Sequence, residues 1–294
     1  MISVTEAAHK AKCRCDAPSI FSSNAAPLAR KWRHDRGGYT TKITRRDLFE
    51  QSVQVMAASG ALPALRLLPD HHPSADKPLK LVVVGGHPDD PESGCGGTIA
   101  LHTSLGHDVT ILYLTRGEAG IEGKSHEDAA ATRTAESEKA CSILGARPVF
   151  AGQIDGDTEI NRARYTNFAK ILSNENPDIV LTHWPVDTHR DHRAASLLAY
   201  DAWLESGRKF ALYYYEVDAG EQTQIFHPTH YVDITQTESR KRAACMAHAS
   251  QQPETTFYVL HDLMNRFRGM ECGVKYAEGF VRHTQNMSRD SLAL

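Results

Sequence analysis

A short apolar run that breaks on two glycines constrains this chain more than any other feature. Residues 81–84 read Leu-Val-Val-Val, and Gly85 and Gly86 follow directly. A β-branched run bounded by turn residues is typical of a strand buried on both faces, as in parallel sheets covered by helices. Because ligands bind beyond the carboxyl ends of such strands, we expect the residues after this run to lie in a binding crevice.

Further apolar, β-rich runs alternate with stretches of helical spacing along the rest of the chain. This alternation predicts an α/β fold: a Rossmann-like, mostly parallel sheet with helices on both faces, built from right-handed βαβ units. A span of about 215 residues fits a single domain, which we place at residues 79–294. We expect strands at 81–84, 109–114, 148–151, 178–182, 211–217 and 230–234, a turn at 94–98, and helices at 97–105, 125–140, 159–172, 194–204, 237–249 and 254–270.

The first 78 residues do not share this pattern. Arg45 and Arg46 precede a weakly apolar segment at 52–68, which resembles a twin-arginine export signal, and residues 70–78 read as a linker. We therefore predict a leader at 1–78 and export to the periplasm or another extracytoplasmic compartment. The alternative is a cytoplasmic protein with a disordered N-terminal arm.

Composition excludes several classes of protein. The net charge is −3 and no basic stripe stands out, which argues against a nucleic-acid partner. No stretch approaches the roughly 18 apolar residues of a membrane span. The six cysteines are too scattered for a disulfide framework or a zinc ribbon, and Cys13 and Cys15 receive no role.

Metal-ligating side chains follow two of the predicted strands. His87 and Asp90 come after the first strand, and His192 closes a run at 183–192 with three histidines and two aspartates after the strand at 178–182. In a doubly wound sheet these two strand ends can be neighbours. His87, Asp90 and His192 would then supply three ligands and leave one position open, as in catalytic zinc sites.

Three further residues suggest the chemistry of amide hydrolysis. Asp89 adjoins a predicted ligand and is suited to act as the general base for an attacking water. His189 lies three residues before His192, so it can face the site and donate a proton or stabilise an oxyanion. Asp191 can hold the His189 imidazole in the useful tautomer.

These stretches resemble the PIG-L/LmbE family of zinc-dependent de-N-acetylases. The resemblance extends over about residues 79–251 and rests on an H-P-D-D-x-E box at 87–92, Gly-Cys-Gly-Gly-Thr at 94–98 and H-x-D-H at 189–192. It implies the same ligands and the same roles for Asp89 and His189. It also implies that Glu92, Arg133 and Asp155 contact the sugar.

We therefore expect a hydrolase that removes an acetyl or other acyl group from an N-acetylglucosamine-type amino sugar. The expected cofactor is Zn²⁺, with Fe²⁺ as the alternative; the partner is a small-molecule substrate, and a homo-oligomer is left open. The competing hypotheses are a non-catalytic, metal-dependent sugar-binding protein and a two-histidine, one-carboxylate iron enzyme. A nucleotide-binding module fits less well, because the glycines lack G-x-G-x-x-G spacing and carboxylates stand where a phosphate would lie.

Overall fold

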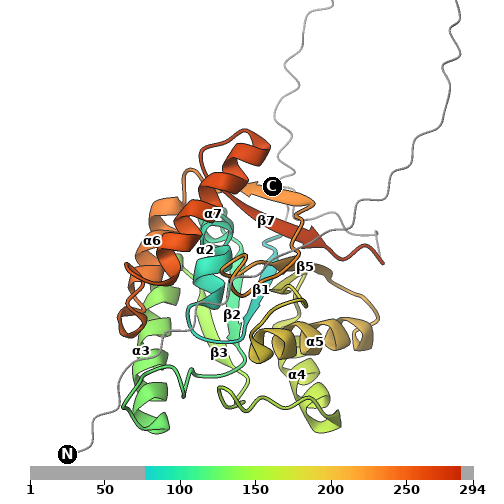
Figure 1. Ribbon diagram of the computed structural model, residues 1–294. Helices are drawn as coiled ribbons and strands as arrows, with labels where there is room; N and C mark the ends of the chain where they lie inside the picture. The colour runs from blue at the N-terminus through green and yellow to red at the C-terminus, as the bar shows by residue number, and fades with distance from the viewer. Residues whose placement is uncertain (1–76, 286–294) are drawn as a thin grey trace, which may run out of the picture. The chain divides into compact units, whose positions relative to one another are not determined.

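The computed structural model describes residues 77–285, and its centre is one mixed β-sheet (Figure 1). The strand order in the described chain is β3-β2-β1-β4-β5-β7-β6. The first five strands are mutually parallel, while β7 pairs antiparallel with both β5 and β6. The strands are β1 (Lys80–Gly85), β2 (Asp108–Tyr113), β3 (Arg147–Phe150), β4 (Ile179–His183), β5 (Ala211–Tyr215), β6 (His230–Asp233) and β7 (Ala277–Arg282).

Helices cover both faces of the sheet, as predicted. Figure 1 shows α4 and α5 on one side and α3, α6 and α7 on the other. The helices are α2 (Asp90–Ser104), α3 (His126–Leu144), α4 (Arg162–Glu175), α5 (Arg190–Glu205), α6 (Glu238–Met246) and α7 (Phe257–Cys272), with a 3₁₀ turn at Ala249–Gln251.

The side chains of β1 alternate between two halves of the hydrophobic core, one on each face of the sheet. Leu81 and Val83 pack with residues of α2, α3 and α6, whereas Val82 and Val84 pack with residues of α4 and α5. Successive side chains of a strand point to opposite faces, so a strand covered on both sides must be apolar throughout. This accounts for the unbroken apolar run that marks the strand in the sequence.

The structure differs from the sequence predictions in two features. The glycine-rich segment at 94–98 is not a turn but the middle of α2, which begins at Asp90 rather than at residue 97. Its glycines allow close packing: a Cβ on Gly97 would lie 2.6 Å from the Cβ of Ile234. Strand β7, which lies between β5 and β6 in the sheet, was not predicted from sequence, and its pairing partners are distant in the chain.

The strand order positions the functional site. Connections run from β1 outward through β2 to β3, and then return to β4 on the other side of β1. The carboxyl ends of β1 and β4 therefore flank the point where the winding reverses, which is where ligands bind in open α/β sheets.

Among residues 77–285, no helix combines the length and the apolar character needed to cross a bilayer. The export hypothesis concerns residues 45–68, which lie outside the described part of the chain, so it stays a prediction.

Candidate metal centre

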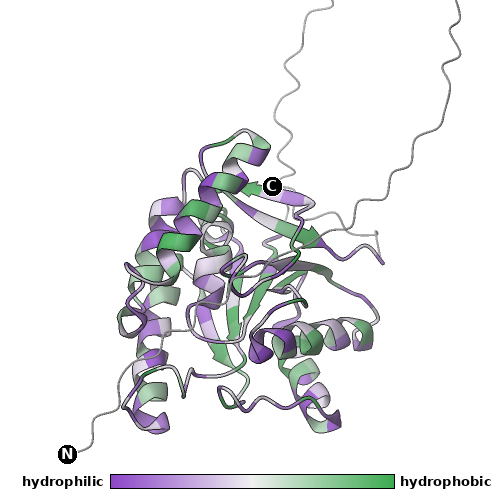
Figure 2. Ribbon diagram, viewed as in Figure 1, coloured by the Kyte–Doolittle hydropathy of each residue, from purple (hydrophilic) through white to green (hydrophobic). Residues whose placement is uncertain are grey.

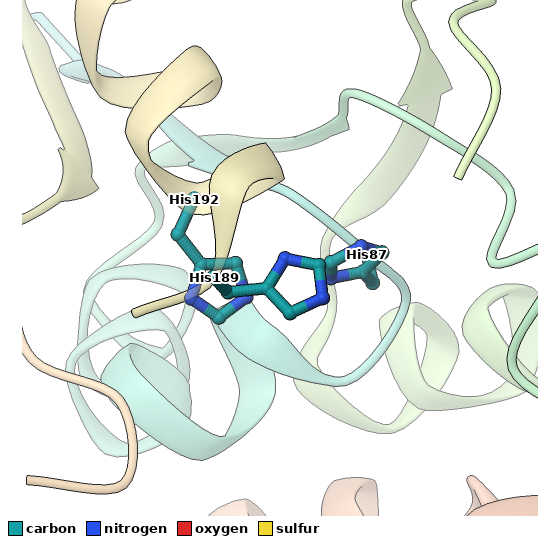
Figure 3. Close-up of side chains that lie close together, drawn as sticks. All are labelled: His87, His189 and His192. Atoms are coloured by element: carbon teal, nitrogen blue, oxygen red, sulfur yellow. The ribbon is translucent and has the colours of Figure 1, made fainter. Parts of the chain in front are cut away.

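The two predicted clusters meet at the point where the sheet reverses its winding. His87 lies two residues beyond β1, and His189 and His192 lie at the start of α5, which follows β4. Figure 3 shows the three imidazole rings gathered at this point. One nitrogen atom from each ring falls within 4.8 Å of the others.

Asp90 lies between the two predicted histidine ligands. One of its carboxylate oxygens is 3.2 Å from Nδ1 of His87, and the other is 3.3 Å from Nε2 of His192. All three side chains are buried. The structure thus brings together the three residues predicted as ligands: His87 from the loop after β1, Asp90 from the first residue of α2 and His192 from the first turn of α5.

The remaining nitrogen of each of these rings faces another carboxylate. Nε2 of His87 is 3.1 Å from both Asp155 and Asp191, and Nδ1 of His192 is 3.2 Å from Asp187. Carboxylates behind metal-ligating histidines fix the ring orientation and make the ligand more basic. Each histidine is therefore oriented as a metal ligand needs to be.

The carboxylates of this cluster favour positive charge on the groups beside them. Burial disfavours protonated histidine, yet the surrounding carboxylates raise the pKa of His87 well above its usual value and that of His192 to about 9. For Asp90, burial favours the neutral acid, but the charged His192 beside it holds its pKa well below the usual range. A buried group of carboxylates that recruits protons onto histidines fits a divalent cation, which would replace those protons.

Asp89, the residue predicted as the general base, lines the cavity in a strained backbone conformation. It precedes α2 with φ 109°, where non-glycine residues are rare, and its N–H donates to Glu92 Oε2 at 3.2 Å. The pKa of Asp89 is raised to about 6, chiefly by burial. The charge on Arg133 acts to lower this pKa, and the charge on Asp90 acts to raise it.

Arg133 contacts Asp89 directly. Its Nη2 donates to Asp89 Oδ2 at 2.8 Å and to the carbonyl of Pro88. Gly117 and Gly120 leave room for the guanidinium, because a Cβ at either position would collide with it. The arginine predicted to contact the sugar is thus already paired with the candidate base, although it also lines the cavity.

The predicted pairing of Asp191 with His189 is wrong. The Asp191 carboxylate lies against His87 and accepts hydrogen bonds from the Gly156 N–H and the Thr158 hydroxyl. His189 instead caps α5, its Nδ1 accepting the Asp191 backbone N–H at 3.3 Å. Residues at the cap and in the first turn point in different directions, so two close neighbours in sequence serve different partners.

His189 faces the same site, with a ring nitrogen within 4.8 Å of a carboxylate oxygen of Asp155 and of Asp191. Its ring packs edge-on against His87, with centroids 4.6 Å apart. Burial, together with the charges on His87 and His192, lowers its pKa below the usual value. With Nδ1 accepting a backbone hydrogen bond, the neutral ring carries its proton on Nε2.

The other two residues predicted to contact the sugar differ in their surroundings. Glu92 is fully buried, is absent from the cavity lining, and accepts a 2.5 Å hydrogen bond from the Tyr113 hydroxyl. This argues against contact between Glu92 and a substrate. Asp155 does line the cavity, but it also contacts His87 and accepts the Ala119 N–H.

Sequence reasoning gave no role to three residues that adjoin the centre. His183, the last residue of β4, stacks on His192 at 4.0 Å and accepts the Gly86 N–H through Nε2; burial and the charge on His192 lower its pKa to about 4. Asp187 supports His192, and buried His248 lies 3.3 Å from Glu92. His183 and Asp187 lie in the histidine-rich run at 183–192, so this run was the sequence feature that could have identified them as part of the site.

The site opens into a cavity of about 900 Å³. Its lining includes His87, Asp89 and His192 together with residues of α7. This volume is ample for a sugar and part of an attached group.

Comparison with known proteins decides the family. The PIG-L profile, described as GlcNAc-PI de-N-acetylase, matches residues 82–203. Diacetylchitobiose deacetylase from Thermococcus kodakarensis is 31% identical, with 68% of this chain aligned to 81% of that protein. The chain belongs to the PIG-L family.

Two further relatives indicate the breadth of this family. A conserved protein of known structure from Thermus thermophilus is 33% identical, with a TM-score of 0.61 over 69% of this chain and 94% of its own. The 4-oxalmesaconate hydratase of Pseudomonas putida is 27% identical, with 70% and 92% covered. Membership in the PIG-L family confirms the predicted enzyme class, a hydrolytic de-N-acetylase that acts on amides.

Proposed function

We propose that this PIG-L protein is a zinc-dependent hydrolase that removes an acyl group, acetyl in the simplest case, from the nitrogen of an N-acetylglucosamine-type sugar. The observation that carries the proposal is the convergence of His87, Asp90 and His192 beside Asp89 at the floor of one cavity. The deacetylases among its relatives, including one named for diacetylchitobiose, support the choice of an N-acetylated sugar.

The donor set suits zinc. Two imidazoles and one carboxylate with an open position describe a catalytic zinc site, and they also describe the iron(II) facial triad. We favour zinc because Asp89, next to this donor set and paired with Arg133, provides the base that water activation requires and an oxygenase does not. Zinc bound here would act as a Lewis acid that polarises the amide carbonyl.

The protein's own residues would then divide the proton transfers. Asp89 takes a proton from the attacking water as the water oxygen bonds to the carbonyl carbon, and Arg133 keeps this carboxylate ionised before the step. His189 Nε2 donates a hydrogen bond to the developing oxyanion. When the C–N bond breaks, the proton held by Asp89 passes to the amine nitrogen, leaving the free amino sugar and the carboxylic acid, which then ionises.

The hydratase relative names a competing reaction. A carboxylate-bearing substrate needs cationic partners, and Arg133, the only lysine or arginine among the described residues that line the cavity, is paired with Asp89. This distribution of charge favours a neutral amide substrate over a polycarboxylate.

The test is metal content and amine release on the purified full-length chain. After chelation and reloading, we expect about one Zn²⁺ per chain and release of free amine from N-acetylglucosamine or N,N′-diacetylchitobiose. Asp89→Asn should retain the metal and lose about 10²- to 10⁴-fold in turnover, as removal of a general base implies. His192→Ala should lose the metal.

Three outcomes would reject the proposal. Sugar binding without amine release would support the non-catalytic alternative, and oxygen consumption with Fe²⁺ but no turnover with Zn²⁺ would support the iron enzyme. Near-normal activity of Asp89→Asn would remove the assigned base.

We also propose export through the twin-arginine-like segment at 45–68, tested by fractionating cells that express the chain with Arg45 and Arg46 replaced by lysine.

A further inference from the structure

One wall of the cavity is apolar and comes from a single helix. Phe257, Val259, Leu260 and Leu263 of α7 line the same cavity as His87, Asp89 and His192. Val259 is 58% exposed and Leu263 is 62% exposed, so the wall is open to solvent as well as to the cavity. An apolar surface at the mouth of a polar catalytic site suits an apolar group attached to the substrate.

The apolar surface continues along α7 beyond the cavity. Phe267 and Met270 are 49% and 71% exposed, and they follow Leu263 at helical spacing, while Tyr258 and Asn265 on the opposite side are buried. Figure 2 shows hydrophobic segments recurring along this helix. From Val259 to Met270 this α7 stripe (Val259, Leu263, Phe267 and Met270) spans about 16 Å at 1.5 Å per residue. An exposed apolar stripe that starts inside a binding cavity marks an interaction surface.

The polar part of the rim carries negative charge. Asp155, Asp218 and Glu221 line the cavity together with the carboxylates of the centre. Arg133, the one arginine or lysine in this lining, is paired with Asp89. Arg190 lies just outside it, with one guanidinium nitrogen 3.4 Å from the Gly156 carbonyl. A phosphate or carboxylate beside the sugar would therefore meet carboxylates at the rim.

We propose that the α7 stripe binds an uncharged apolar group carried by the amino sugar, and that the acidic rim disfavours anionic groups at the same position. This inference rests on the proposed deacetylase function and specifies its substrate class. The occupant is the substrate itself, because two residues of the stripe, Val259 and Leu263, line the same cavity as the metal centre. Leu263 and Phe267 determine chain-length preference, and Glu221 determines charge preference.

The first test compares methyl, octyl and dodecyl glycosides of N-acetylglucosamine, each below its critical micelle concentration. On the zinc-loaded full-length chain, kcat/KM should rise by about twofold per methylene that packs on the stripe, half the gain of full burial. In Leu263→Ser and Phe267→Ser the ratio of dodecyl to methyl kcat/KM should fall toward one. Leu197→Ser is the matched control, since Leu197 is 43% exposed on α5 and lies outside the cavity lining, and it should keep the wild-type ratio.

The second test concerns charge. Wild type should turn over N-acetylglucosamine 1-phosphate more slowly than the methyl glycoside. In Glu221→Lys the ratio of phosphate to methyl kcat/KM should rise about 5- to 10-fold, because two units of charge change near the ligand in a largely aqueous rim. An unchanged ratio would overturn the assignment of Glu221.

Failure of the inference differs from failure of the proposed function. If the methyl glycoside is hydrolysed but kcat/KM does not depend on chain length, the α7 stripe is not a substrate subsite although the enzyme is a deacetylase. If Leu263→Ser lowers the molar mass measured by light scattering and leaves the chain-length dependence intact, the stripe is an interface between copies of the chain. If no glycoside is hydrolysed, the proposed function itself fails.

Discussion

Replacing Arg133 by methionine should move the acid limb of the pH–rate profile to higher pH. The guanidinium donates to Asp89 Oδ2 at 2.8 Å and lowers the pKa of this carboxyl, which burial raises to about 6. Methionine fills similar space without charge. Because Asp89 can act as the proposed base only when ionised, any rise in its pKa should remove active enzyme at neutral pH.

The size of the effect follows from the geometry. With a pKa of about 6, about nine-tenths of Asp89 is ionised at pH 7. An opposite charge at this distance lowers a carboxyl pKa by about 1–3 units, so the variant should have a pKa of about 7–9. The ionised fraction at pH 7 then falls to between about one half and one hundredth, and kcat/KM falls about 2- to 100-fold. A bound metal ion acts on both proteins, so the difference between them should persist.

The assay is amine release from N,N′-diacetylchitobiose between pH 5 and 9.5, fitted for the pKa of the acid limb. Activity of Arg133→Met should recover toward the wild-type plateau above the new pKa. Arg164→Met, which removes an exposed arginine on α4 that pairs with Glu159, should leave the limb in place. If Arg133→Met loses activity equally at every pH with an unmoved limb, the arginine binds the sugar, as the family resemblance implied, and our assignment is refuted.

Three further predictions concern the scaffold around the centre. Asp191→Asn should weaken zinc affinity about 10- to 100-fold in a competition titration, because Asp191 supports His87; unchanged affinity would contradict that support. Lys241→Met should lower the free energy of unfolding in urea by about 3–5 kcal/mol, since the fully buried Glu278 loses its cation 2.6 Å away; a loss under 1 kcal/mol would exclude this. Gly97→Ala should lower the free energy of unfolding by about 1–3 kcal/mol in the same measurement, because the new Cβ would collide with Ile234. An unchanged free energy of unfolding would mean that the Ile234 side chain moves aside without cost.

The sequence predicted those features that depend on neighbours in the chain. A strand buried on both faces must be apolar throughout, so β1 was recognisable, and the residues directly after it must lie at the carboxyl edge of the sheet. His87, Asp90 and His192 were predicted as one cluster for this reason, and the structure brings them together. The predicted helix at 125–140 likewise begins where α3 does, and Ser125 caps α3 by accepting the Asp128 N–H.

Predictions from local sequence were wrong where packing between residues distant in the chain determined the structure. Glycines at 94, 96 and 97 read as a turn because glycine is a poor helix former, yet α2 continues through them. Their lack of side chains lets Tyr215, Lys241 and Ile234 approach the helix backbone, a contact that local sequence does not record. β7 was missed because its partners come from β5 and β6.

The sequence by itself determined which side chains gather at the site, because connectivity brings strand ends and helix starts to one edge of the sheet. Only the tertiary structure decided which partner each residue takes. Asp191 and His87 are 104 residues apart, and Arg133 and Asp89 are 44 apart. Apolar residues of α7 likewise line the same cavity as the residues of the centre. Such pairings depend on how helices pack on the sheet, and the free energy of that packing is shared among residues distant in the chain.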